Sequence, residues 1–204
     1  MLKLRAVIVS FLLLGVSLYG GGAKYTLKAD VAPIPVLSKS SGFYIGFGVG
    51  NFKLKDSYTK ERLTSTTATI IVGYDFNKYI SLESRFVRSL HNLDYSKKAT
   101  TALSSRVNST FSNFAIYGKI GYQLNNIKPY LLIGYGENRV TNLAATTRQE
   151  SGVQYGVGIS YKFNNQWKIF TDYIQNYNDK GFDGRAKLDS IKIHTLTVGI
   201  NYHF

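Results

Sequence analysis

Few residues in this chain of 204 are of the types that do covalent or metal chemistry. There are three histidines and no cysteine, which excludes a disulfide framework, a thiolate zinc site and a cysteine nucleophile. His91, His194 and His203 each lack a serine or acidic partner at the spacing of a catalytic pair. We interpret them as surface or rim residues, and predict no catalytic, cofactor or metal site.

Four charged residues form a second candidate group. Glu83, Arg85, Lys119 and Asp172 lie on the polar faces of segments whose other face is apolar. Opposite charges in a narrow, poorly hydrated space are expected to pair, because an isolated charge there is costly. We therefore predict an interior charge network. It is either a plug that satisfies the interior or a gate for a small conductance.

The segments that position these residues alternate with a period of two from Gly42 onward. Between Val153 and Phe163, for example, the odd positions are apolar and the even positions are Gln, Gly, Ser or Lys. Eight such segments predict eight β-strands. Their apolar faces are Phe43/Ile45/Phe47/Val49, Ala68/Ile70/Val72/Tyr74, Ile80/Leu82/Phe86, Phe114/Ile116/Ile120/Tyr122, Leu131/Ile133/Tyr135, Val153/Tyr155/Val157/Ile159/Tyr161/Phe163, Trp167/Ile169/Tyr173 and Leu196/Val198/Ile200/Tyr202/Phe204.

Two compositional features favour a membrane barrel over a soluble sandwich. Glycines recur on the polar faces, where they are poor on a solvated strand but useful inside a narrow barrel. Aromatic residues gather at the strand ends, as interfacial girdles require. The predicted girdle comprises Tyr74, Phe76, Tyr79, Tyr122, Tyr130, Tyr161, Phe163, Trp167, Tyr202 and Phe204.

The connections between the strands alternate in length. Asp75–Lys78, Asn125–Lys128 and Asn164–Gln166 are short and rich in Asn, which indicates tight turns. The other connections, near 52–65, 91–109, 138–152 and 176–189, are long and polar. Short turns at one end and long loops at the other are typical of an outer-membrane barrel, with both chain ends on the periplasmic side. We predict an all-β fold, an eight-stranded antiparallel up-and-down transmembrane barrel over residues 41–204.

The first 40 residues are predicted to lie outside this barrel. Lys3 and Arg5 precede the apolar run Ala6–Leu18, and the small residues Gly21-Gly22-Ala23 follow. This is the pattern of a signal peptide, residues 1–23, cleaved after Ala23; the alternative is an N-terminal membrane anchor. Residues 24–40, with two prolines and no periodicity, are predicted to form an extended periplasmic tail.

Three stretches of sequence resemble the small eight-stranded outer-membrane barrels of the OmpA transmembrane-domain and OmpX type. Gly42-Phe43-Tyr44-Ile45-Gly46 is similar to the opening strand of that family, and residues 116–122 to its fourth strand. Residues 198–204, ending in Tyr202-His203-Phe204, resemble its terminal assembly signal. The resemblance implies that Tyr202 and Phe204 are read by the β-barrel assembly machinery, with periplasmic chaperones as partners during biogenesis.

Loop charge indicates the partners of the mature protein. The net charge is +13, and the outer leaflet that would face the long loops is rich in phosphorylated lipopolysaccharide. Export argues against nucleic acid as a partner, and the loops are the expected contact for a host or other surface ligand. The basic residues in or beside the loops are Lys53, Lys55, Lys60, Arg62, Lys97, Lys98, Arg106, Arg139, Arg148, Lys180, Arg185 and Lys187.

These observations predict a non-enzymatic protein of the Gram-negative outer membrane. The leading function is a structural and surface-interaction role in the envelope, and the alternative is a small porin-like channel for ions or very small solutes. Enzymes of small barrels, such as lipid A deacylases, acyltransferases and omptin-type proteases, need a histidine beside a nucleophile or acid. No such pair stands out in this sequence.

Overall fold

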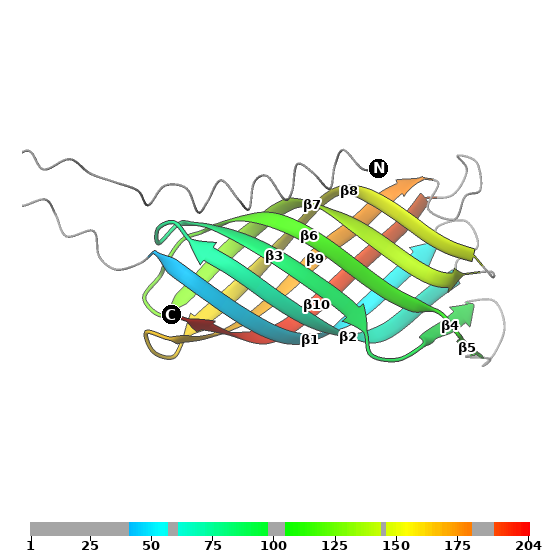
Figure 1. Cartoon of the computed structure of the whole chain (residues 1–204), viewed down its shortest axis with the longest axis horizontal. Coiled ribbons are helices and arrows are strands. Elements are labelled where there is room, and N and C mark those ends of the chain that lie inside the picture. Colours follow the sequence, from blue (N-terminus) through cyan, green and yellow to red (C-terminus); the bar gives the residue numbers. More distant parts are fainter. Residues whose placement is uncertain (1–40, 57–60, 98–104, 144–145, 181–189) are drawn as a thin grey trace, which may run out of the picture. The chain divides into compact units, whose positions relative to one another are not determined.

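The strands of this protein form one antiparallel sheet that closes on itself (Figure 1). Closure occurs at β1 (Gly42–Asp56), which pairs with β10 (Ser190–His203) on one side and with β2 (Glu61–Asp75) on the other. The predicted signal peptide and tail lie outside the described residues. The computed structural model describes residues 41–56, 61–97, 105–143, 146–180 and 190–204.

Ten strand segments form the eight antiparallel strand positions around the barrel wall, which we call staves. β3 (Ile80–Ser89) and β4 (Leu93–Lys97) both pair with β2, so β4 continues the path of β3 after a bend. Likewise β5 (Ser105–Val107), paired with β4, leads directly into β6 (Thr110–Gly121). The predicted eight-stranded antiparallel barrel is therefore confirmed. The remaining staves are β7 (Ile127–Leu143), β8 (Thr146–Lys162) and β9 (Trp167–Lys180).

The two ends of the barrel differ. One end, here called the turn end, carries the three short turns and the C-terminal residue Phe204; the opposite end, the loop end, carries β4 and β5 (Figure 1). At the turn end, the Asn77 side chain accepts hydrogen bonds from the backbone N–H groups of Tyr79 and Ile80, at 2.8 and 2.9 Å. Asn164 does the same for Gln166 and Trp167. These side-chain caps are the physical reason for the Asn-rich turns.

Large apolar side chains cover the outside of the barrel wall. Phe47, Leu131 and Val157 are 56–59% exposed, which excludes a water-facing surface for a wall with so many such residues. On β10 this apolar face runs from Leu196 to Phe204, about 27 Å along the strand and about 20 Å along the barrel axis at the usual tilt. That height suits the hydrocarbon layer of an outer membrane. The described residues contain no helix long and apolar enough to cross a membrane.

Toward the loop end the apolar face moves from the outside to the inside on most strands, β8 excepted. On β1 the outward residues Phe47 and Val49 are followed by inward, buried Phe52 and Leu54, while outward Lys53 and Lys55 are now polar. The prediction of long loops at 52–65, 91–109, 138–152 and 176–189 is therefore wrong in extent, because strands continue into all four segments. The alternation persists there, and only the side facing water has changed.

One member of the predicted aromatic girdle is misplaced. Tyr130 is 3% exposed and points into the barrel, because Lys128 and Leu132 share its face and the outward positions are Leu131 and Ile133. Other members do gather outside at the turn end, where Trp167 packs edge-on against Tyr202 at 4.8 Å.

Candidate functional site

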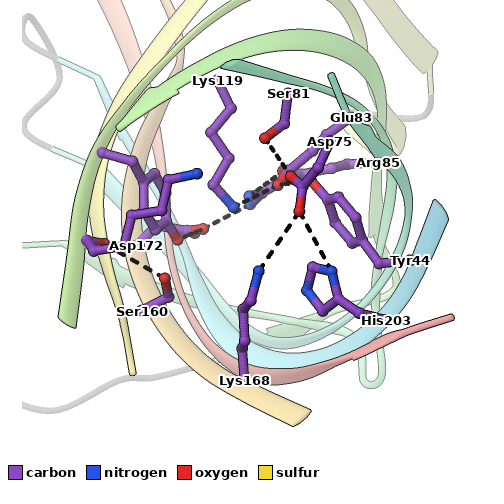
Figure 2. Close-up of polar contacts among 12 residues, drawn as sticks. Tyr44, Asp75, Ser81, Glu83, Arg85, Lys119, Ser160, Lys168, Asp172 and His203 are labelled. Atoms are coloured by element: carbon purple, nitrogen blue, oxygen red, sulfur yellow. Dashed lines mark hydrogen bonds and ion pairs between the residues drawn. The ribbon is translucent and has the colours of Figure 1, made fainter. Parts of the chain in front are cut away.

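The charged residues predicted from the sequence meet inside the barrel (Figure 2). Glu83 of β3 is fully buried and accepts four hydrogen bonds from three side chains. Its Oε1 is 2.6 Å from the Tyr44 hydroxyl and 2.7 Å from Lys119 Nζ. Its Oε2 receives the Nε and Nη2 groups of Arg85, at 2.8 and 2.6 Å. A buried carboxylate is tolerated only with such complete pairing.

Arg85 carries this network across the lumen. Its Nη1 donates to Asp172 Oδ2 of β9 at 2.8 Å, and the Tyr130 hydroxyl donates to the same oxygen at 3.0 Å. Because β3 and β9 are four staves apart in a ring of eight, they lie on opposite walls. The four residues Glu83, Arg85, Lys119 and Asp172 thus form one electrically neutral bridge across the barrel, which we call the charge bridge.

Two tyrosine–glycine pairs make room for the charge bridge. Tyr44 lies directly opposite Gly73, and Tyr130 directly opposite Gly158. A Cβ atom on either glycine would collide with the facing tyrosine ring. The absence of a side chain lets each ring lie along the wall, so that its hydroxyl reaches Glu83 or Asp172.

A second charged cluster, missed by the sequence reasoning, lies at the turn end of the lumen (Figure 2). Asp75 accepts a 2.5 Å hydrogen bond from Ser81, and its Oδ2 is 3.5 Å from Lys168 Nζ and 3.4 Å from His203 Nδ1. The signal was present in the alternation. Lys168 shares the inward parity of Asp172, but Asp75 was assigned to a turn and His203 to the rim.

Above the charge bridge, toward the loop end, lies a layer of buried amides and hydroxyls. Asn113 donates to Asn138 at 3.0 Å, and Thr195 donates to Asn176 at 2.9 Å. Tyr117 donates to Gln154, which also accepts a longer hydrogen bond from Asn176. This layer is neutral and links β6, β7, β8, β9 and β10 from within.

An apolar cluster fills the lumen at the loop end. The Phe52 and Phe111 rings stack at 4.0 Å, and eight further buried side chains surround them. None of the ten is more than 7% exposed. We call this set the apolar plug. It consists of Phe52, Leu54, Leu63, Val87, Leu93, Phe111, Val140, Tyr177, Ile191 and Ile193.

The three histidines are dispersed. His91 is exposed at a bend near the loop end, His194 lies half-buried on the outer wall, and His203 takes part in the turn-end cluster. No group of three metal-binding side chains occurs among the described residues.

The loop-end basic residues fall into two sets. Lys53, Lys55 and Arg62 lie on the outer wall together with Lys192, and Arg139 lies on the outer wall of β7 beside Glu137. Arg148 is half-buried on β8. The side chains of Lys60, Lys97, Lys98, Arg106, Lys180, Arg185 and Lys187 lie outside the described part of the structure.

A family model described as "Outer membrane protein beta-barrel domain" matches residues 31–204. The chain belongs to this family. It is therefore an outer-membrane protein of the Gram-negative envelope, embedded in the lipid bilayer by its apolar outer wall. No curated protein matches it by sequence.

Solved barrels share the fold at low sequence identity. Neisserial surface protein A is 19% identical, with a TM-score of 0.58, over 81% of this chain and 99% of that one. Ail of Yersinia pestis, solved with the heparin analogue sucrose octasulfate, is 17% identical with a TM-score of 0.53 over the same shares. OprG of Pseudomonas aeruginosa is 11% identical with a TM-score of 0.51, over 81% and 97%.

The charge bridge predicts a large stability loss for Glu83→Ala. The substitution leaves Arg85 short of one acid and Lys119 without its carboxylate, which should lower the free energy of unfolding by about 3–5 kcal/mol. Urea unfolding in lipid vesicles, followed by the fluorescence of the single Trp167, measures it. Glu137→Ala is the control, because the Glu137–Arg139 pair is exposed and worth at most about 1 kcal/mol. Equal effects of the two substitutions would contradict the bridge.

The tyrosine–glycine pairs predict a position-dependent effect of valine. Gly73→Val places a branched side chain against the Tyr44 ring, and should destabilise the barrel by about 1–3 kcal/mol while weakening the Tyr44–Glu83 hydrogen bond. Gly152→Val is the matched control, since nothing lies within 4 Å of a Cβ there. The unfolding midpoints of both variants, measured in the same vesicles, test this difference in stability. A harmless Gly73→Val would show that Tyr44 is not packed on this glycine.

Proposed function

We propose that this protein is a sealed, non-enzymatic barrel that acts through its outer surface and loop end, as a structural and surface-interaction protein of the envelope. The observation that carries the proposal is the filled lumen. A lumen that the described side chains cross and close leaves the outer surface and the loop end as the parts available for interaction.

Three successive layers in the lumen support this proposal over the channel alternative. The charge bridge crosses the full width, the amide layer follows it, and the apolar plug closes the loop end. Ions crossing the plug would lose most of their hydration, because its side chains are largely apolar and the neighbouring Ser65 and Ser89 hydroxyls already hydrogen-bond to backbone groups. Rearranging the charge bridge alone would therefore leave the path shut.

The orientation of the barrel follows the general plan of its family. We place the turn end, where the barrel begins and ends, in the periplasm, and the loop end at the cell surface. In that orientation the assembly signal at Tyr202 and Phe204 faces the periplasmic side, where assembly machinery and chaperones would meet it.

Basic residues at the loop end supply the contact with an anionic surface. Lys53, Lys55, Arg62 and Lys192 all lie on one part of the outer wall. Lipopolysaccharide is the nearest polyanion in this orientation, and a host or partner surface is the other class of ligand. The Ail barrel, of the same fold, has been solved with a sulfated heparin analogue, which supports polyanion contact as a property this fold can carry.

The proposal predicts an electrically silent protein. Purified wild-type protein in planar bilayers should give no steady openings, and Glu83→Ala should remain closed because the apolar plug is intact. Folding of the protein that is added is verified by its heat-dependent gel mobility, since a closed ladder resists SDS until boiled. Steady unitary openings in the wild type would instead establish the channel.

A further inference from the structure

Three cations stand side by side on the outside of the barrel at the loop end. Lys55 of β1 lies directly opposite Arg62 of β2 on one side and Lys192 of β10 on the other. All three side chains are exposed. Directly opposed residues of an antiparallel pair have Cβ atoms about 5 Å apart, so the long side chains of this row can converge on one small anion.

The row is not neutralised by any acidic side chain in the described part of the structure. None of its three members forms an ion pair with a described acidic residue. Like charges directly opposite one another destabilise a sheet. Arg139 at the same end is arranged differently, because it has Glu137 at 3.4 Å and Gln149 at 2.9 Å. Among the residues whose side chains the structure describes, no acidic group neutralises the row, which leaves it suited to an anion from outside the chain.

The next rung toward the membrane extends the basic surface. Lys53 lies directly opposite His194, and the His194 ring stacks on exposed Tyr173 with centroids 5.4 Å apart. A further cation and a flat aromatic wall thus adjoin the row. This combination suits an anionic group attached to a sugar ring.

The position of the row favours a lipid over a soluble polymer. On β10 the outward face passes from Leu196, the first residue of its apolar face, through His194 to Lys192 within four residues. In the proposed orientation, these outer-wall side chains would project sideways, toward the lipid headgroups around the barrel. Cations directly above an apolar band meet the phosphates of the lipids whose acyl chains cover that band.

We infer that Arg62, Lys55 and Lys192, with Lys53 on the next rung, form a binding site for a phosphate of the lipid anchor of lipopolysaccharide. The inference rests on the proposed function, in which the loop end faces the outer leaflet. The inference adds to that function the chemical group that is bound, which is a phosphate, and the residues that bind it.

The test measures lipid binding by the folded full chain. Native mass spectrometry in detergent would titrate diphosphorylated lipid A, and the same lipid after enzymatic removal of its phosphates, against the wild type and Lys55→Gln/Arg62→Gln/Lys192→Gln. Loss of three cations should weaken binding of phosphorylated lipid A on the order of 100-fold, and the single Lys55→Gln about fivefold. Dephosphorylation should weaken binding to the wild type but not to the triple variant. Arg139→Gln, which removes a cation that already has an acidic partner, should bind like the wild type.

The triple and single variants of the row should fold, because removing cations relieves repulsion, and heat-dependent gel mobility verifies the folding of these two and of Arg139→Gln. Wild-type binding that survives dephosphorylation, or that the triple and single variants leave unchanged, would overturn the site. Heparin, a soluble polyanion, would be titrated against the same variants. Loss of heparin binding in the triple variant with unchanged lipid A binding would assign the row to soluble polyanions instead and overturn the lipid assignment. Failure of the proposed function would appear separately, as steady conductance of the wild type.

Discussion

A backbone that crosses lipid has no water to bond, so the ladder of this protein must close, and closing it with eight strands leaves a narrow interior. This narrow width limits which side chains fit in the lumen. Tyr44 fits only because Gly73 faces it, and Tyr130 only because Gly158 does. With both rings against the wall, Arg85 reaches from β3 to Asp172 on the opposite side.

Along its axis, the closed barrel has two parts with different surroundings, one in the membrane and one beyond it. In the membrane the outside is apolar, and the interior holds charges and amides. Beyond Val49 on β1 the outside is polar and the interior is the apolar plug, as in a small soluble barrel. The change of surroundings places the seal and the outer basic row at the same end. In the function that we propose, the seal withholds the lumen from solutes, and the row offers positive charge to the lipid or surface around it.

Alternation carried most of the fold in the sequence, because a period of two reports which face of a strand meets apolar surroundings. It placed Glu83, Arg85, Lys119 and Asp172 on the inner face, and the structure brings all four into contact. Alternation failed where the surroundings changed. Phe52 and Leu54 break the outward apolar set, which predicts the end of the strand, although only the surroundings of its two faces change there.

Other features depend on register between strands that are distant in sequence. The pairings around the closed barrel bring Lys192 beside Lys55 and Lys168 within reach of Asp75. The residue pattern of a single strand contains no information about such neighbours. Tyr130 was assigned to the girdle because its position near a strand end outweighed its parity. Its inward orientation depends on the hydrogen bond to Asp172 and on the space above Gly158.

The central claim, that the lumen is sealed between the charge bridge and the apolar plug, can be measured by cysteine accessibility, since the chain has no native cysteine. Thr67, fully buried on β2 between these layers, would be replaced by cysteine, with exposed Lys55→Cys as the reference. In folded protein in vesicles, a small charged thiol reagent should label the Lys55→Cys variant rapidly and leave Thr67→Cys unmodified until the barrel is unfolded. Comparable labelling rates at the two positions would contradict the sealed lumen.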